Sequence, residues 1–421
     1  MKHDLDRMAD DIKKRMVDTG DDMQNQLFRL ARAGEPRASK SVKQRIWQVI
    51  RDERMVVSGL SPEQLVLKMF QRNWGLGPIQ EIYDDSDVNE VWVNGPGEGN
   101  VWIETNGKRV RSDISFGTAD AIREVQQRLL SMENQELNQT HPMVEAKTLD
   151  GSRVTLTCPP ETTQRTITLR KHNTIALTTE DYIALKTLDQ QTANLLQTLV
   201  EGRANLLLIG STSSGKTSLL KWLSQFIPHN LRIGVLEGTY ELALDQFLPN
   251  HNVISFEEQP GLGRSLLKQF HTMLRQSPDI IILGEARGAE ADQMVKTFRR
   301  GHPGSLSTIH SNSPEAAIQD LSDMVMEDGR NWDQQALYLR VARSIDVIVQ
   351  MHLETETGIR RLWRVTEVDC PELSERVSFH DIVTFQPSTG TWHCSPETVS
   401  SDFEEKLRLQ GISLSEGEVI L

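Results

Sequence analysis

The chain has 421 residues and a net charge of −13, because 59 Asp and Glu outnumber 46 Lys and Arg. This length exceeds one typical domain, so we expect two folded units with terminal extensions. No stretch concentrates Lys and Arg as a phosphate-tracking surface would, so direct nucleic-acid binding is not expected. The three cysteines lack CxxC spacing, which argues against a disulfide framework or a zinc site and fits a reducing cytoplasm.

The amino terminus is densely charged and lacks the apolar core of a signal peptide. No later segment approaches the roughly 20 apolar residues that a spanning helix needs. We therefore expect a cytoplasmic protein that would act on a membrane from one side.

Residues 1–55 carry both signs of charge with scattered Ile, Leu and Met, and we expect a helical, charged extension with little core of its own. An amino-terminal α/β domain is expected over 56–172. Its predicted strands lie in VNEVWVNG and GNVWIETNGKRV, which alternate around Asn-Gly and Gly turns, and in DGSRVTLTCPP and QRTITLRKH. The segment AIREVQQRLLSM has helical spacing, and a linker is expected over 173–180.

A second α/β domain is expected over 181–370. The segment ANLLQTLVEGRANLLLIG predicts a helix and a strand, and strand signals recur in LRIGVLEG, HNVISF, DIIILGE and SLSTIHSN with helical stretches between them. This alternation predicts a parallel or mixed sheet flanked by helices. Residues 371–421 have several Pro and Gly breaks and one short helical run, SDFEEKLRLQ, so we expect an appendage there.

The stretch GSTSSGKTS satisfies G-x-x-x-x-G-K-[ST], with an aliphatic run before it and helical spacing after it. Glycines let successive N–H groups converge on phosphate oxygens, and the helix adds its positive end. Lys216 would reach the β- and γ-phosphates, and the Thr217 hydroxyl would bind Mg²⁺. The sequence therefore predicts a loop for a nucleoside triphosphate, formed by Gly210, Ser211, Thr212, Ser213, Ser214, Gly215, Lys216, Thr217 and Ser218.

Acidic residues follow two other predicted strands. The aliphatic run before Glu285 delivers it to a carboxyl strand end, where ligands gather in open α/β sheets, so Glu285 is predicted near Mg²⁺. LEGTYEL places Glu237 and Glu241 just past another strand. His302 and His310 flank a third, and for both the plainer alternative of a structural histidine stays open.

Seven motifs in this order resemble the secretion ATPase superfamily of type II secretion, type IV pili and type IV secretion, and most of all its Tad/Flp pilus (CpaF-like) branch. They are VNEVWVNGP, DGSRVTLTCPP, TITLRKH, GSTSSGKTSLL, LEGTYEL, SPDIIILGEARGAEADQM and GHPGSLSTIHSNSPEAAIQDL. The resemblance implies a RecA-like P-loop NTPase carboxy-terminal domain and a smaller mixed α/β, PAS-like amino-terminal domain. It also implies ATP and Mg²⁺ as cofactors, and a homo-hexamer at the inner membrane whose partners are platform proteins in that membrane.

The resemblance also implies residue roles. Glu241 matches the glutamate that polarises the attacking water, Glu285 the Walker B glutamate, and His310 the histidine near the γ-phosphate. Arg153 and Arg170 match arginines of the amino-terminal domain that close onto the phosphates. A guanidinium would stabilise the charge that spreads over the phosphoryl oxygens, although solvent-facing strand arginines are the plainer alternative.

One position departs from the family pattern. Relatives usually carry Glu-Asp in the acidic motif, whereas this chain has Glu237-Gly238, so slow turnover and compensation by Glu237 are both open. Arg287, beside Glu285, is expected either in a structural ion pair or in the ring interface. Two alternatives to a secretion or pilus motor are a conjugation-type ATPase that exports DNA or protein, and a nucleotide-dependent regulator that hydrolyses weakly.

Overall fold

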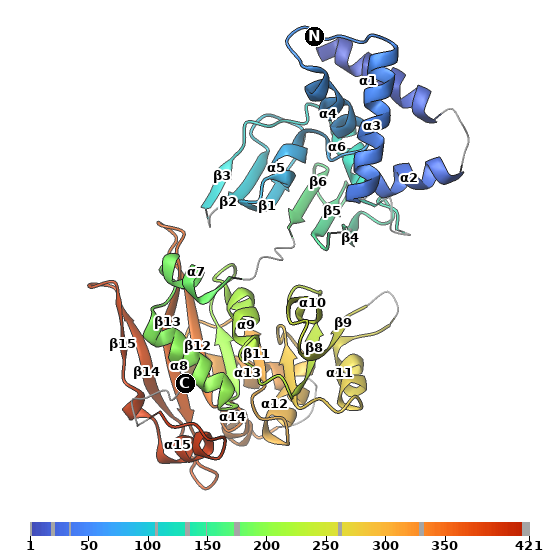
Figure 1. Ribbon diagram of the computed structural model, residues 1–421. Coiled ribbons are helices and arrows are strands. Elements are labelled where there is room, and N and C mark those ends of the chain that lie inside the picture. Colours follow the sequence, from blue (N-terminus) through green and yellow to red (C-terminus); the bar gives the residue numbers. More distant parts are fainter. Residues whose placement is uncertain are drawn as a thin grey trace. The chain divides into compact units, whose positions relative to one another are not determined.

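The computed structural model describes residues 2–17, 22–32, 35–105, 108–130, 135–148, 150–171, 177–259, 263–327 and 332–414 (Figure 1). The chain divides into two compact units, Met1–Asn173 and Thr174–Leu421. One expected Asn-Gly turn at 106–107, residues 173–176 of the expected linker and residues 415–421 lie outside the described residues.

The first unit contains a six-stranded antiparallel sheet in the order β3-β2-β1-β6-β5-β4. Burial alternates along β5 and β6, as the two-residue period of a strand with one covered face requires. Ile122, Val125 and Leu129 of α6 (Ala119–Leu129) pack on the apolar face. The predicted strands and helix are confirmed, and β4 is an addition. The strands are β1 (Val88–Val93), β2 (Val101–Thr105), β3 (Lys108–Arg111), β4 (Met143–Lys147), β5 (Arg153–Thr157) and β6 (Thr166–Arg170).

Helices before this sheet have a hydrophobic core of their own, which the sequence did not lead us to expect. Ile12, Phe28, Ile46 and Trp74 are buried together, so residues 1–55 pack with the helix that follows them. Asn73 Nδ2 donates to the Ala9 carbonyl at 2.8 Å and ties the fourth helix to the first. The elements are α1 (Lys2–Val17), α2 (Asp22–Arg32), α3 (Pro36–Asp52), α4 (Pro62–Asn73), η1 (Gly77–Ile79) and α5 (Gln80–Asp84).

The second unit is built on a nine-stranded mixed sheet in the order β15-β14-β13-β12-β7-β11-β10-β8-β9. Neighbours from β12 to β9 are parallel, and those from β12 to β15 are antiparallel. The predicted mixed sheet is confirmed. Its strands are β7 (Leu206–Ile209), β8 (Arg232–Glu237), β9 (Asn252–Glu257), β10 (Ile280–Leu283), β11 (Leu306–Ile309), β12 (Val347–Leu353), β13 (Arg360–Asp369), β14 (Ser378–Gln386) and β15 (Thr391–Cys394).

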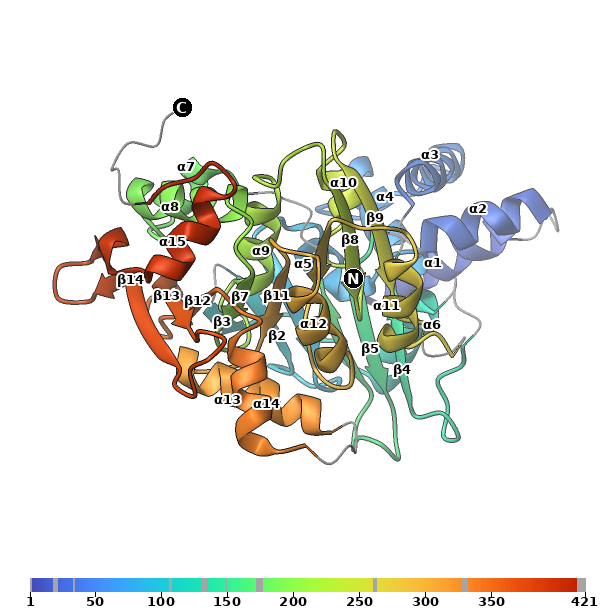
Figure 2. The same ribbon diagram turned by 90° about the horizontal axis from the view of Figure 1, so that it is seen from below.

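Helices cover both faces of this sheet (Figure 2). Leu206 and Leu208 of β7 join one core cluster, and Leu207 and Ile209 join the other, so β7 is buried on both sides and reads as a continuous aliphatic run. Among the described helices none is long and apolar enough to span a bilayer. The elements are α7 (Thr179–Ala184), α8 (Gln190–Glu201), α9 (Lys216–Ser224), α10 (Leu244–Phe247), α11 (Leu266–Leu274), α12 (Glu290–Arg299), α13 (Pro314–Met326), α14 (Gln334–Ala342), η3 (Pro396–Thr398) and α15 (Ser401–Arg408).

Residues after 370 belong to the second unit, so the expectation of an appendage over 371–421 is wrong for the part that the structure describes. β14 pairs along β13, and β15 pairs along β14. Phe403 and Leu407 of α15 lie in the same core cluster as Leu206. The Pro and Gly residues here mark turns and ends of elements in a continuing sheet, which is why they resembled breaks between loose segments.

Leu407→Ala tests whether α15 is integral to the second unit. The side chain is 0% exposed, so we expect its truncation to lower the free energy of unfolding by about 2 to 5 kcal/mol. Leu409→Ala, two residues on and 78% exposed, is the matched control and should change it little. Equal, small effects in chemical denaturation of the two variants would show that α15 is a surface attachment.

Candidate active site

The GSTSSGKTS stretch lies between a strand and a helix, as the sequence predicted. β7 ends at Ile209, and α9 begins at Lys216. The loop between them turns through three residues with positive φ, Gly210 at 147°, Ser213 at 62° and Gly215 at 94°. Such angles let the N–H groups of consecutive residues face inward, which is the geometry of an anion-binding backbone.

Contacts from β12 and β13 hold this loop in place. A Cβ on Gly210 would lie 2.3 Å from the Met351 carbonyl oxygen, so only glycine fits under that strand. Arg360 Nε donates to the Ser213 carbonyl at 2.8 Å and supports its left-handed conformation. Neither Met351 nor Arg360 was identified from the sequence. They come from a hairpin far along the chain, and only the pairing of β12 with β7 brings it to the loop.

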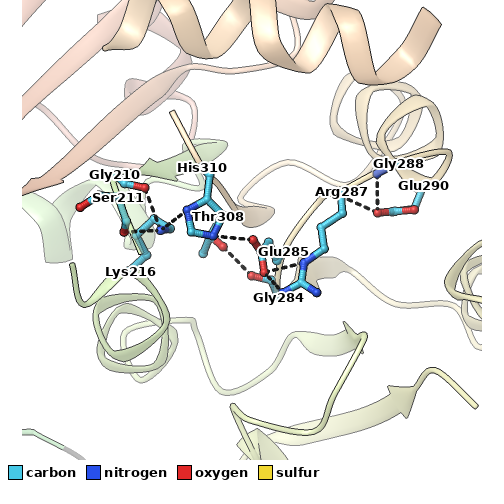
Figure 3. Close-up of polar contacts among 10 residues, drawn as sticks. All are labelled: Gly210, Ser211, Lys216, Gly284, Glu285, Arg287, Gly288, Glu290, Thr308 and His310. Carbon is cyan, nitrogen blue, oxygen red and sulfur yellow. Dashed lines mark hydrogen bonds and ion pairs between the residues drawn. The ribbon is translucent and has the colours of Figure 1, made fainter. Parts of the chain in front are cut away.

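Lys216 folds back over the loop (Figure 3). Its Nζ donates to the carbonyls of Gly210 and Ser211, each at 2.9 Å, and lies 3.3 Å from His310 Nδ1. The residue is buried, so its ammonium group is held at the inner edge of the loop. This places a fixed positive charge beside the inward-facing amides.

His310 joins Lys216 to Glu285 (Figure 3). Its Nε2 lies 2.9 Å from Glu285 Oε1. Because an ammonium group only donates, Nδ1 accepts from Lys216 and the ring proton lies on Nε2, facing the carboxylate. Burial lowers the pKa of His310, and Lys216 lowers it further against the opposing effect of Glu285. The neutral imidazole therefore bridges the lysine and the glutamate.

Arg287 forms the ion pair that was one of two expectations for it. Its Nε donates to Glu285 Oε2 at 2.8 Å, and this hydrogen bond raises the pKa of Arg287, with a smaller contribution from Glu241. Glu290 Oε1 accepts from the backbone N–H groups of Arg287 and Gly288, at 2.7 and 3.0 Å. The loop after β10 is thereby fixed with Glu285 directed toward His310.

The acidic LEGTYEL segment is folded by its own first glutamate. Glu237 is buried at the end of β8, and its Oε1 accepts from the N–H groups of Glu241 and Leu242, at 2.9 and 2.8 Å. Glu237 therefore orients the turn that carries Glu241. A Cβ on Gly238 would meet only Glu258 Oε2, at 3.8 Å, so the fold leaves room for the aspartate that relatives carry.

The two histidines differ in position. His310 follows β11 at the edge where β7 and β10 also end, beside the GSTSSGKTS loop. His302 precedes β11 and therefore lies at the opposite edge, where its carbonyl accepts from Ser305 Oγ at 2.7 Å. His302 is therefore not one of the residues that the strand ends bring to the GSTSSGKTS loop.

Arg153 and Arg170 lie in the first unit, directly opposite each other on β5 and β6, and therefore on the same face of that sheet. Glu90 of β1 pairs with Arg170 from the other side. Burial raises the pKa of Glu90, and Arg170 opposes that rise. Two adjacent guanidinium groups on one face form a patch suited to an anion.

The residues present fit a nucleotide better than they fit a metal held by protein alone. The Ser214 Oγ is buried in the loop and has no hydrogen-bond partner among the described residues. Over the described parts of the chain, no three His, Cys, Asp or Glu side chains gather that could hold a metal ion. Thr217, in the first turn of α9, and Glu285 carry oxygen donors of the kind that Mg²⁺ takes from proteins beside substrate phosphates.

The chain is similar to several known proteins. Residues 73–396 match the family model described as "Type II/IV secretion system protein". The type IV secretion system protein VirB11 of Brucella suis is 28% identical over 339 residues, which cover 71% of this chain and 90% of that protein. A putative conjugal transfer protein of Mycobacterium tuberculosis is 28% identical over 304 residues, covering 68% and 83%. The crystal structure of the Brucella suis VirB11 ATPase in complex with sulphate superposes with a TM-score of 0.38 at 26% identity, covering 69% of this chain and 95% of that one.

The family model spans most of the chain, from the end of α4 through β15. The chain therefore belongs to the type II/IV secretion system protein family. It is a nucleotide-binding ATPase of that family.

Gly210→Ala tests the contact with Met351. The new methyl group would overlap the Met351 carbonyl and would also impose strain at positive φ, so we expect the variant to lose about 2 to 4 kcal/mol of unfolding free energy. Gly301→Ala is the control, because its φ is also positive, at 105°, while its Cβ would meet open space. Equal losses in the two variants would show that backbone strain alone, and not the β12 contact, demands glycine at 210.

The pKa of His310 is expected below 6.5 in protein free of nucleotide and metal, because burial and Lys216 both disfavour the charged ring. NMR titration of the histidine ring signals would measure it, with His310→Gln assigning the resonance. Because the pKa of His310 is lower in the folded chain than in the unfolded chain, the free energy of unfolding decreases as the pH falls from the ordinary pKa toward the lowered one. A midpoint at or above 6.5 would contradict the neutral bridge between Lys216 and Glu285.

Proposed function

We propose that this ATPase is the motor of a secretion or pilus-assembly system. It works as a homo-hexameric ring on platform proteins of the inner membrane, from the cytoplasmic face. The observation that carries the proposal is the continuous path from Lys216 through His310 to Glu285, which links the loop after β7 to the loop after β10. Such a path is what a site needs if it is to sense the terminal phosphate of a bound nucleotide.

ATP is bound by residues 210–218. Amides of the loop and the Lys216 ammonium hold the β- and γ-phosphates, once the ammonium exchanges its carbonyl partners for phosphate oxygens. Thr217, in the first turn of α9, and Glu285 would hold Mg²⁺ beside those oxygens. When bound, the metal would supply positive charge that neutralises the phosphates.

Glu241 orients the attacking water in this proposal. Its backbone is held by Glu237, and its carboxylate acts on Arg287, the partner of Glu285, so both glutamates belong to one electrostatic cluster. A carboxylate in this position can also accept a proton from the water as its oxygen attacks the γ-phosphorus and the bond to ADP breaks. Departure of the phosphate then removes negative charge from the site.

Arg153 and Arg170 supply the arginines that meet the phosphates from the amino-terminal domain. Their placement on one sheet face supports this role, since two guanidinium groups together can match several phosphoryl oxygens. Loss of the γ-phosphate would weaken their attraction to the second unit. We propose that domain movement driven in this way, coupled around the ring, becomes mechanical work.

The motifs favour the Tad/Flp branch, with a PAS-like domain over 56–172 and a RecA-like domain from 181. The similarity to a putative conjugal transfer protein favours a second candidate, export of DNA or protein by the same engine. A third, a weakly hydrolysing regulator, rests on Gly238. The space beside Gly238 would accommodate an aspartate side chain, which supports the loss of one carboxylate from an otherwise unchanged backbone.

Glu241→Gln separates binding from hydrolysis. The amide keeps the size of the side chain but cannot accept the water proton, so we expect unchanged ATP binding and a fall in phosphate release of at least about 100-fold. Fluorescent-nucleotide titration and a phosphate-release assay measure the two. The size of the assembly, measured with and without Mg-ATP in the same samples, tests whether the chain forms a hexamer.

Glu356→Gln is the control for this experiment. Glu356 is exposed in the turn between β12 and β13, so its loss should leave turnover intact. Full phosphate release by the Glu241 variant would remove that residue from the proposed role. No phosphate release by the unmodified chain, with normal ATP binding, would favour the regulator.

A further inference from the structure

The first unit contains a cavity of about 680 Å³, between the helices at its amino terminus and the β4–β5 end of its sheet. Helices α2, α3, α4 and α5 and the turn after β4 contribute to its wall, and we call it the helix–sheet cavity. Its volume lies within the range of small-molecule sites, roughly 300 to 1,000 Å³. It lies wholly in the first unit and is formed without any residue of the GSTSSGKTS loop.

Aromatic side chains form the apolar part of the wall. Phe70 and Trp74 are buried, whereas Trp47 is 41% exposed. Trp74 is 0% exposed, yet its indole N–H has no hydrogen-bond partner among the residues that the structure describes. A buried donor without a partner is costly, so the packing around Trp74 is not optimised for the stability of the helices alone.

The acids in the wall already have partners. Asp150 accepts from Tyr83, Thr148 and the Ser152 N–H. Asp84 accepts from Gln80 Nε2 at 2.9 Å, and Glu63 accepts from Ser61 Oγ at 2.8 Å. The negative charges of the cavity are therefore committed to the protein's own donors.

Two of the cations in the wall are not committed in this way. Arg32 Nε is buried and finds no hydrogen-bond partner in the described part of the chain, and Lys40 forms no ion pair with any residue described there. Arg128 is close enough to Arg32 and Arg72 for each to disfavour its charge, and burial lowers the pKa of Arg128 to about 10. Glu124 already pairs with Arg128 at 3.0 Å, so the positive charge that an anion would stabilise in this cavity is that of Arg32 and Lys40.

We propose that the helix–sheet cavity binds a small amphipathic anion. An aromatic or aliphatic body lies against Trp47, the exposed aromatic side chain of the wall, and a carboxylate, sulfonate or phosphate-ester group pairs with Arg32 and Lys40. The ligand contacts α2 and α3 on one side and the sheet on the other, so it stabilises their packing by mass action. The site contains no residue of the GSTSSGKTS loop, and its ligand regulates the packing of the amino-terminal helices.

The test uses two fluorescent probes that share an arylaminonaphthalene body. 1-Anilinonaphthalene-8-sulfonate carries a sulfonate, and N-phenyl-1-naphthylamine is neutral. Both are titrated into the full chain with Mg-ADP present, so that the nucleotide site does not take up the sulfonate. We expect the anionic probe to bind at least about tenfold more tightly, since hydrogen bonds to charged groups discriminate by that much or more.

Arg32→Gln should abolish this difference between the probes. Arg45→Gln is the matched control, since Arg45 is an exposed residue of α3 that does not line the cavity, and it should preserve the difference. Lys40→Gln gives an independent measurement from an exposed position, in case loss of Arg32 impairs folding. Trp47→Phe should reduce energy transfer from tryptophan to the anionic probe, whereas Trp102→Phe, outside the cavity wall, should not.

Equal binding of the two probes to the unmodified chain would overturn the proposal. So would preference for the anion that survives both the Arg32 and the Lys40 substitutions, because the sulfonate would then bind elsewhere. Energy transfer that falls equally in the Trp47 and Trp102 variants would likewise place the probe outside the cavity.

Discussion

The close approach of the Met351 carbonyl to Gly210 is the constraint on which the active site depends. This contact fixes the path of the loop where it leaves β7. Arg360 of β13 then holds Ser213, which has a left-handed conformation, through a hydrogen bond to its carbonyl. With the loop so placed, α9 begins with the Lys216 ammonium directed back over the loop carbonyls. A methyl group at position 210 would therefore disturb the loop, its hydrogen bond with Arg360 and the start of α9.

This placement of the loop aligns a row of charged and polar side chains across the site. Lys216, neutral His310, Glu285 and Arg287 form a line in which each group contacts the next, and none is left as an isolated buried charge. Phosphate oxygens would compete with the carbonyls and with His310 for the lysine, so binding at one end of the line changes the balance at the other. Glu237 fixes the turn that carries Glu241, because it accepts from the backbone N–H groups of Glu241 and Leu242.

The first unit combines two kinds of positive charge. Arg153 and Arg170 lie on a sheet face with Glu90 beside them, where an acid moderates their repulsion. Arg32 and Lys40 lie in the wall of a cavity whose acids are committed to other donors. The first arrangement suits contact with a changing phosphate, and the second suits a ligand that stays and stabilises the packing of helices on the sheet.

The sequence alone determined the features that rest on local pattern. The loop at 210–218 could be recognised from its own residues and from the strand and helix signals on its two sides, and the carboxyl-end position of Glu285 follows from the short aliphatic run that precedes it. Tertiary structure decided whatever depends on distant pairing. β12 to β15 and α15 join the sheet only through long-range contacts, and these bring Met351 and Arg360 to the loop. Sheet polarity likewise separated His310 from His302, because the two flank one strand and only its carboxyl end faces the loop.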